Sequence, residues 1–191
     1  MKNPFLTGAH IYLRALERAD APTILPWIND GNVIGNLTIH RPLNLAAEEA
    51  FIEAANRSEV DVIFGICSRT SDRLIGVTGL QRIDHRNRHA MFGIFIGPAG
   101  NRGLGHGTEA TALVVAYAFD TLNLNRVWLH VFEDNTAAIR AYEKAGFTRE
   151  GLLRDDDFRR GRFRNTVVMG IIRRDRQASR APRKTRQVSS R

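Results

Sequence analysis

The feature that most constrains this chain of 191 residues is a glycine-rich segment between an apolar run and an amphipathic one. It reads Arg102-Gly103-Leu104-Gly105-His106-Gly107-Thr108, follows the apolar run from Met91 to Ile96, and opens an apolar-periodic segment that continues to about Leu122. This order predicts a strand, a tight turn and a helix. Glycine lets the backbone adopt positive φ, and the first turn of a helix has N–H groups without intrahelical partners. Because such groups and the helix dipole favour phosphate, we expect this backbone to bind a pyrophosphate.

Two well-known phosphate motifs do not fit the segment. A dinucleotide-binding fold requires G-x-G-x-x-G after the first strand of a βαβ series, whereas the spacing here is Gly103-x-Gly105-x-Gly107 in the middle of the chain. A P-loop requires Lys after its last glycine, and residue 108 is Thr. On the segment alone, a tight turn without a ligand is an equal alternative.

Length and composition predict one globular domain. The chain is 43% hydrophobic and 25% charged, which is ordinary for such a domain. No apolar run approaches the roughly 20 residues of a membrane helix, and we expect no signal peptide, no membrane contact and a cytoplasmic location. The single cysteine, Cys67, lies in an apolar run, which excludes an internal disulfide and favours a buried, inert thiol.

The net charge of +8 belongs almost entirely to the end of the chain. From Arg173 onward lie eight of the 28 basic residues and one of the 20 acidic residues, which leaves 20 basic and 19 acidic residues before it. The segment also contains Ser, Pro and Gln and almost nothing to bury, which favours disorder. We therefore expect a folded domain over residues 1–172 and a basic, disordered tail over residues 173–191.

The spacing of apolar residues predicts the order β-α-α-β-β-β-α-β-α-β-β. The expected strands cover residues 10–14, 60–68, 73–80, 89–96, 126–132, 147–153 and 163–172. The expected helices cover about 20–29, 46–56, 106–122 and 135–145, and a polar loop, residues 154–162, joins the last two strands. Three hairpin-connected strands followed by βαβ connections predict an α/β fold with a mixed sheet and helices on both faces.

A second motif supports the first. The segment Asn135-Thr136-Ala137-Ala138-Ile139-Arg140-Ala141-Tyr142-Glu143-Lys144-Ala145-Gly146-Phe147 resembles N-x-x-A-I-x-x-Y-x-K-x-G-F. Together with Arg102-x-x-Gly105-x-Gly107, it is similar to the two signatures of the GNAT N-acetyltransferase superfamily. The resemblance extends from about His10 to Ile172, and its ending is similar to the branch of ribosomal-protein alanine and spermidine acetyltransferases. It implies the GNAT fold, a mostly antiparallel sheet with two splayed parallel strands, and acetyl-CoA as cosubstrate without a metal.

The resemblance also implies a cofactor site and an acid. The matching cofactor positions are Ile94, Phe95, Ile96, Arg102, Gly103, Leu104, Gly105, His106, Gly107, Thr108, Asn135, Ala138 and Tyr142. A backbone N–H near Ile94 or Phe95 would polarise the thioester carbonyl. Asn135 would cap its helix and bond the cofactor, and Tyr142 would protonate the departing CoA thiolate, with a core aromatic as the alternative.

Three candidates for the general base stay open: Glu133, His130 and an ordered water chain. Relatives often carry Glu in an A-E-x-G pattern in the fourth strand, whereas this chain has Met91 at that position. This departure weakens the spermidine reading most. His130 has a suitable pKa, although a structural histidine is the alternative. His85 and His89 bracket a turn, and we expect no metal site.

These observations predict an acetyl-CoA-dependent N-acetyltransferase in which the amine attacks directly within a ternary complex. The first expected acceptor is a protein N-terminus, such as that of a ribosomal protein. A small-molecule amine (polyamine, amino sugar, amino acid or antibiotic) is the alternative, and the acids at residues 155–157 would face its positive charge. A further alternative is a non-catalytic protein whose basic tail binds ribosome or nucleic acid weakly. We expect a monomer or a homodimer.

Overall fold

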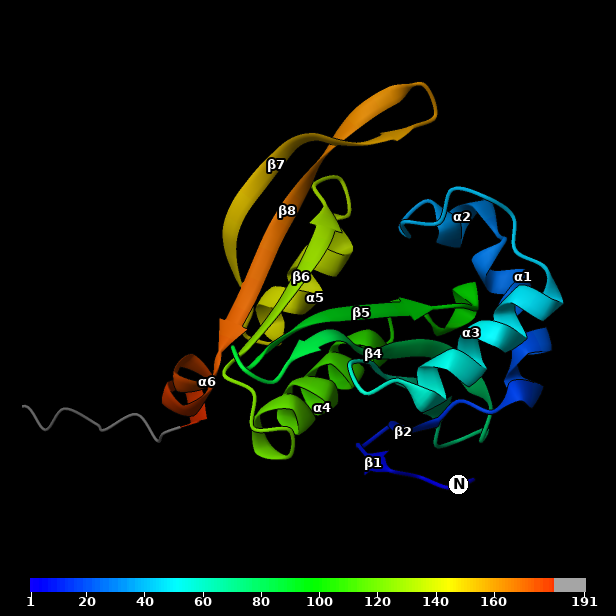
Figure 1. Ribbon diagram of the computed structural model, residues 1–191, viewed down its shortest axis with the longest axis horizontal. Coiled ribbons are helices and arrows are strands. Elements are labelled where there is room, and N and C mark those ends of the chain that lie inside the picture. The colour runs from blue at the N-terminus through cyan, green and yellow to red at the C-terminus, as the bar shows by residue number, and fades with distance from the viewer. Residues whose placement is uncertain (181–191) are drawn as a thin grey trace, which may run out of the picture.

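The computed structural model describes residues 1–180 (Figure 1). The strands are β1 (Leu6–Thr7), β2 (Ile11–Ala15), β3 (Val62–Ser68), β4 (Leu74–Asp84), β5 (His89–Ile96), β6 (Arg126–Phe132), β7 (Thr148–Arg159) and β8 (Arg162–Ile172). The helices are α1 (Ala21–Ile28), α2 (Gly31–Ile34), α3 (Leu45–Arg57), α4 (His106–Asp120), α5 (Thr136–Lys144) and α6 (Arg173–Arg180), with 3-10 turns η1 (Arg18–Asp20) and η2 (Ala99–Asn101).

The strands form one sheet in the order β1-β2-β3-β4-β5-β6-β8-β7. Neighbouring strands run antiparallel except β5 and β6, which are parallel, so the predicted mixed sheet is confirmed. The pairing of β5 with β6 covers three positions, from His89 with Arg126 to Met91 with Trp128. Both strands then continue without pairing with each other, and Figure 1 shows them moving apart. Two unpaired strand edges therefore lie in the middle of the sheet.

Helices cover both faces of the sheet, as the sequence predicts, and each face has its own apolar core. On one face, Val114 of α4 and Ile139 of α5 share a core with Val127 of β6. On the other face, Ile24 of α1 and Ile52 of α3 share a core with Val77 of β4. Because side chains alternate between faces along a strand, the central strands contribute to both cores.

The β7–β8 hairpin differs from its prediction. The sequence predicts a polar loop over residues 154–162, whereas β7 continues to Arg159 and β8 begins at Arg162. Between the pairs Leu153–Thr166 and Asp157–Arg164, β7 contains three residues and β8 contains one. Such a bulge interrupts the two-residue alternation of side chains, so the continuing strand has no clear sequence pattern.

The end of the chain also differs in part. The sequence predicts a disordered tail from Arg173, whereas residues Arg173–Arg180 form α6. Arg173 donates from Nε to the carbonyl of Leu124 at 3.0 Å, and Arg176 forms an ion pair with Asp120 of α4 at 3.0 Å. Charges that composition assigns to a solvated tail are thus bonded to the folded body. Residues 181–191 of the expected tail lie outside the described residues.

A close contact at Gly97 fixes the end of β5 against α1. A Cβ atom at Gly97 would lie 2.1 Å from Cδ2 of the Trp27 indole. The Gly97 N–H donates to the carbonyl of Ile75 at 3.0 Å, which extends the pairing of β5 with β4 by one residue. The absence of a side chain at Gly97 therefore lets α1 reach the strand end that precedes the glycine-rich segment.

We expect Gly97→Ala to lower the free energy of unfolding by about 1–3 kcal/mol, because the added methyl group overlaps the indole. Urea denaturation measures the change. The matched control is Gly100→Ala, since a Cβ atom there meets nothing within 4 Å, and its effect should stay within about 0.5 kcal/mol. Equal stability of the two variants would contradict the close contact.

Candidate active site

The glycine-rich segment forms a turn that opens α4. Gly103 and Gly105 have φ values of 77° and 85°, and Gly105 is the N-cap residue, without a side-chain cap. The N–H groups of His106, Gly107 and Thr108 have no hydrogen-bond acceptor within residues 1–180. Left-handed backbone followed by free helical N–H groups is a geometry that binds anions.

The space above this turn is open. A Cβ atom built at Gly103, Gly105 or Gly107 would meet nothing within 4 Å. Packing within the described chain therefore does not explain the absence of side chains at these positions. Open space above free N–H groups is what the close approach of a phosphate group requires.

Arg102 holds the turn to β5. Its guanidinium donates to the carbonyl of Gly97 at 2.7 Å and to that of Ile96 at 3.2 Å. The sequence prediction offered it as a charged contact for phosphate. In the structure its donors are directed to the strand end, so it orients the turn that carries the free N–H groups.

The unpaired edge of β5 presents Ile94 and Ile96. Since the Gly97 N–H donates to β4, the two-residue alternation turns the N–H of Phe95 toward β4 as well. The N–H groups of Ile94 and Ile96 then face the side where β6 has moved away. Of the two donors that the sequence left open for a thioester carbonyl, the geometry favours Ile94 over Phe95.

Asn135 begins α5, as the sequence predicts. Its side-chain oxygen accepts the N–H of Ala138 at 3.2 Å, which makes it the N-cap. Its amide nitrogen donates to the side-chain oxygen of Asn36 at 3.2 Å. The cap therefore also connects α5 to the segment that follows α2, a short helix that the sequence prediction missed.

Tyr142 lies about two turns after Asn135 in α5, in an aromatic pocket. Its ring centroid is 6.1 Å from that of Phe92 and 6.0 Å from that of Phe147, and the residue is 9% exposed. Loss of hydration on burial raises the pKa of its phenol to about 12. The hydroxyl therefore keeps its proton throughout the neutral pH range.

The two candidate bases lie at the end of β6 in different surroundings. Glu133 is exposed, and its carboxylate accepts a hydrogen bond from the Asn165 side chain at 2.8 Å. His130 is exposed and stacks edge-on with Trp128, the ring centroids being 5.2 Å apart. Leu129, next to His130 in β6, packs in the core that contains Tyr142, so alternation places His130 on the opposite face of the sheet. The structure therefore does not bring His130 and Tyr142 together.

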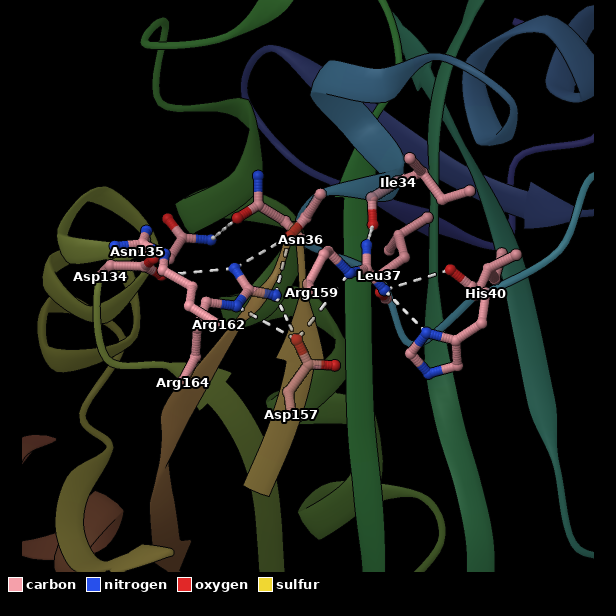
Figure 2. A network of polar contacts seen from close by, with 12 residues as sticks. Ile34, Asn36, Leu37, His40, Asp134, Asn135, Asp157, Arg159, Arg162 and Arg164 are labelled. Carbon is pink, nitrogen blue, oxygen red and sulfur yellow. Dashed lines mark hydrogen bonds and ion pairs between the residues drawn. The ribbon is translucent and has the colours of Figure 1, made fainter. Parts of the chain in front are cut away.

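The sequence predicts that Asp157 faces the acceptor, whereas the structure pairs it with arginine side chains. The sequence offers residues 155–157 as acids for a cationic amine. The Asp157 carboxylate is buried, however, and accepts hydrogen bonds from Arg164 at 2.7 and 3.1 Å, with the Arg159 guanidinium 3.8 Å away (Figure 2). Its charge is already neutralised by the chain. Sequence spacing could not identify this pairing, because the bulge in β7 alters the register.

Residues 1–180 contain neither a cluster of metal-binding side chains nor a helix suited to cross a membrane. Within that part of the chain, no group of three or more His, Cys, Asp or Glu side chains is arranged to hold a metal ion. None of the described helices combines the length and apolarity needed to cross a bilayer.

The comparisons with known proteins all identify acetyltransferases. The acetyltransferase (GNAT) domain model matches residues 10–148. The spermidine N(1)-acetyltransferase of Escherichia coli K12 is 37% identical over 176 residues, covering 87% of this chain and 89% of its own length. YdaF of Bacillus subtilis, named provisionally as a ribosomal N-acetyltransferase, is 31% identical over 102 residues, covering 53% and 55%.

A solved structure confirms the predicted fold. The crystal structure of spermidine N-acetyltransferase from Vibrio cholerae in complex with CoA and spermine matches with a TM-score of 0.82 and 27% identity. The match covers 88% of this chain and 98% of that chain. The likeness therefore extends over most of the chain.

We expect Gly105→Val to abolish CoA binding, because a branched side chain would fill the space above the free N–H groups. Isothermal titration calorimetry measures the affinity. Valine at positive φ also strains the backbone, so the matched control is Gly161→Val, which has φ of 78° and equally open surroundings at the hairpin turn. Comparable loss of affinity in both variants, or normal affinity of Gly105→Val, would contradict a binding role for this turn.

Proposed function

Because the chain belongs to the GNAT acetyltransferase family, we propose that it transfers the acetyl group of acetyl-CoA to a primary amine of a small molecule, with polyamines the first class to test. The observation that carries the proposal is the set of free N–H groups at the start of α4 beside the unpaired edge of β5. The turn would seat the pyrophosphate, and the strand edge would seat the thioester arm.

The choice of acceptor follows from the relatives. The Escherichia coli relative named for spermidine matches over most of both chains, whereas the relative named for ribosomal acetylation matches over about half. A small-molecule amine therefore has more support than the protein N-terminus that the sequence placed first. Met91 supplies no carboxylate in β5, so the exposed acid at the end of β6, Glu133, is the group we assign to attract a cationic amine.

The chain's own residues would assist three events. The acceptor nitrogen attacks the thioester carbonyl carbon, the carbon–sulfur bond breaks, and the acetyl group moves to nitrogen. The Ile94 N–H stabilises charge on the carbonyl oxygen. Tyr142 gives its proton to the departing sulfur, and the proton lost by the amine passes to Glu133 directly or through water. Holding both reactants in one site supplies much of the rate through orientation.

Because burial raises its pKa, Tyr142 is protonated at neutral pH and has a proton to donate. In water a thiol has a pKa near 8.5 and a phenol a pKa near 10, so proton transfer from the phenol to the thiolate is modestly unfavourable there. Burial that disfavours phenolate disfavours thiolate as well, which raises the sulfur pKa toward that of the phenol. An apolar pocket shared by both groups therefore makes the transfer feasible.

A panel of amines tests the proposal. With acetyl-CoA and a thiol-release readout, we expect spermidine or spermine to give turnover well above that of amino sugars, amino acids and peptides with free N-termini. Preference for an N-terminal peptide would overturn the acceptor class. Absence of thiol release with every amine would overturn the enzymatic function.

We expect Tyr142→Phe to lower kcat by about 10²–10⁴-fold, because the departing thiolate loses its proton donor. Single-turnover measurement isolates the chemical step. The Kd for CoA and the midpoint of unfolding should change little, since the aromatic ring stays in its pocket. A chemical step as fast as that of the unmodified enzyme would remove Tyr142 from catalysis.

A further inference from the structure

The segment after α2 has few backbone hydrogen bonds of its own. We name residues 34–40, from the last residue of α2 onward, the strap. Its N-terminal part continues α2 with short-range bonds, such as Leu37 N–H to Ile34 O at 3.1 Å. For residues 38–40, no backbone N–H bond to any other part of residues 1–180 is formed. The strap therefore depends on contacts from elsewhere for a fixed position.

Leu37 and Ile39 pack against the core of α1 and α3, and Arg159 at the end of β7 supplies most of the hydrogen bonds that reach the strap from elsewhere. Its guanidinium donates to the carbonyls of Leu37 at 2.8 Å, Ile39 at 3.1 Å and Ile34, and it lies 3.3 Å from Nδ1 of His40 (Figure 2). The side chain is 14% exposed, so these bonds form largely away from water. One planar cation thus binds three strap carbonyls that are about 120 residues away in the sequence.

Arg164 of β8 adds a second anchor. It donates from two nitrogens to the carbonyl of Gly35, each at 3.3 Å, and its guanidinium lies 3.8 Å from the centroid of the Phe132 ring. Asp157 is placed against both arginines, and Asp134 lies 3.6 Å from Arg164. The hairpin therefore presents a pair of cations whose orientation is fixed by a shared buried carboxylate.

The anchored strap adjoins the proposed reaction site. Asn36 in the strap bonds the side chain of Asn135, the N-cap of the helix that carries Tyr142. Phe132, under the Arg164 guanidinium, is the last residue of β6 and directly precedes Glu133. The strap therefore lies where β6 ends, on the side of the sheet opposite the core that holds Tyr142.

We propose that Arg159 and Arg164 are positioning residues that clamp the strap over the acceptor side and so set the affinity for the amine. The inference rests on the proposed acetyl transfer to an amine. Neither arginine needs to touch the reacting atoms. Within residues 1–180, no long-range backbone N–H donates to the strap carbonyls. Loss of the two arginines should therefore loosen the acceptor side and leave the glycine-rich turn intact.

Arg159→Ala tests the clamp with two independent readouts. Amide hydrogen exchange over residues 34–40 should become faster by on the order of tenfold. The KM for the amine should rise by on the order of tenfold or more, while kcat and the Kd for CoA change by less than about threefold. Arg159→Lys keeps the charge but lacks the wide, planar fork that places donors on three separate carbonyls, so both readouts should be intermediate.

The matched control is Arg154→Ala, which removes an exposed arginine from the same strand without touching the strap. It should leave both readouts unchanged. Unchanged exchange in Arg159→Ala would overturn the clamp, and faster exchange with an unchanged KM for the amine would overturn its link to the acceptor. If the unmodified protein acetylates no amine, the proposed function fails, and the exchange measurement alone decides whether the arginines hold the strap.

Discussion

The site depends on two parallel strands that pair at three positions and then separate. A buried strand edge without partners is costly, since each N–H and C=O requires a hydrogen bond. The crossover helix that joins β5 to β6 must begin at the end of the sheet where β5 finishes. Consequently the free N–H groups of α4 and the unpaired edge of β5 meet at the same end. The topology alone places anion-binding and amide-pairing groups next to one another.

The core beside β6 and the exposed end of β6 provide different surroundings at that meeting point. Tyr142 lies in an aromatic core, where burial keeps its proton in place. Glu133 stands at the end of β6 in contact with solvent and is oriented by Asn165. The proposed proton donor and proton acceptor therefore lie in different environments. Pairs of groups with contrasting surroundings are how one site can both give and receive a proton near neutral pH.

Local sequence patterns predicted much of this arrangement. The glycine spacing and the apolar periodicity of α4 predicted a strand, turn and helix, and the limits of β5 and β6 match their predicted ranges. Asn135 is recognisable as a cap because capping is decided within one helical turn. The bulge in β7 was missed because it interrupts the two-residue alternation of side chains, and α2 was missed because it is only four residues long. The strap was missed because its position depends on partners more than 100 residues away. Likewise Asp157 reads as a free acid until the hairpin register places two arginines beside it.

The order β6-β8-β7 has a consequence for how the chain folds. The last strand lies between two earlier ones, so β7 can join the sheet only through β8. The clamp on the strap therefore cannot form until the final strand is in place, although the strap belongs to the first quarter of the chain. During synthesis, an early segment must wait for nearly the whole polypeptide before it becomes ordered. A chain shortened before β8 could retain the core that α1 and α3 form with β4, which contains no residue of β8, and still lack the surface that faces the acceptor.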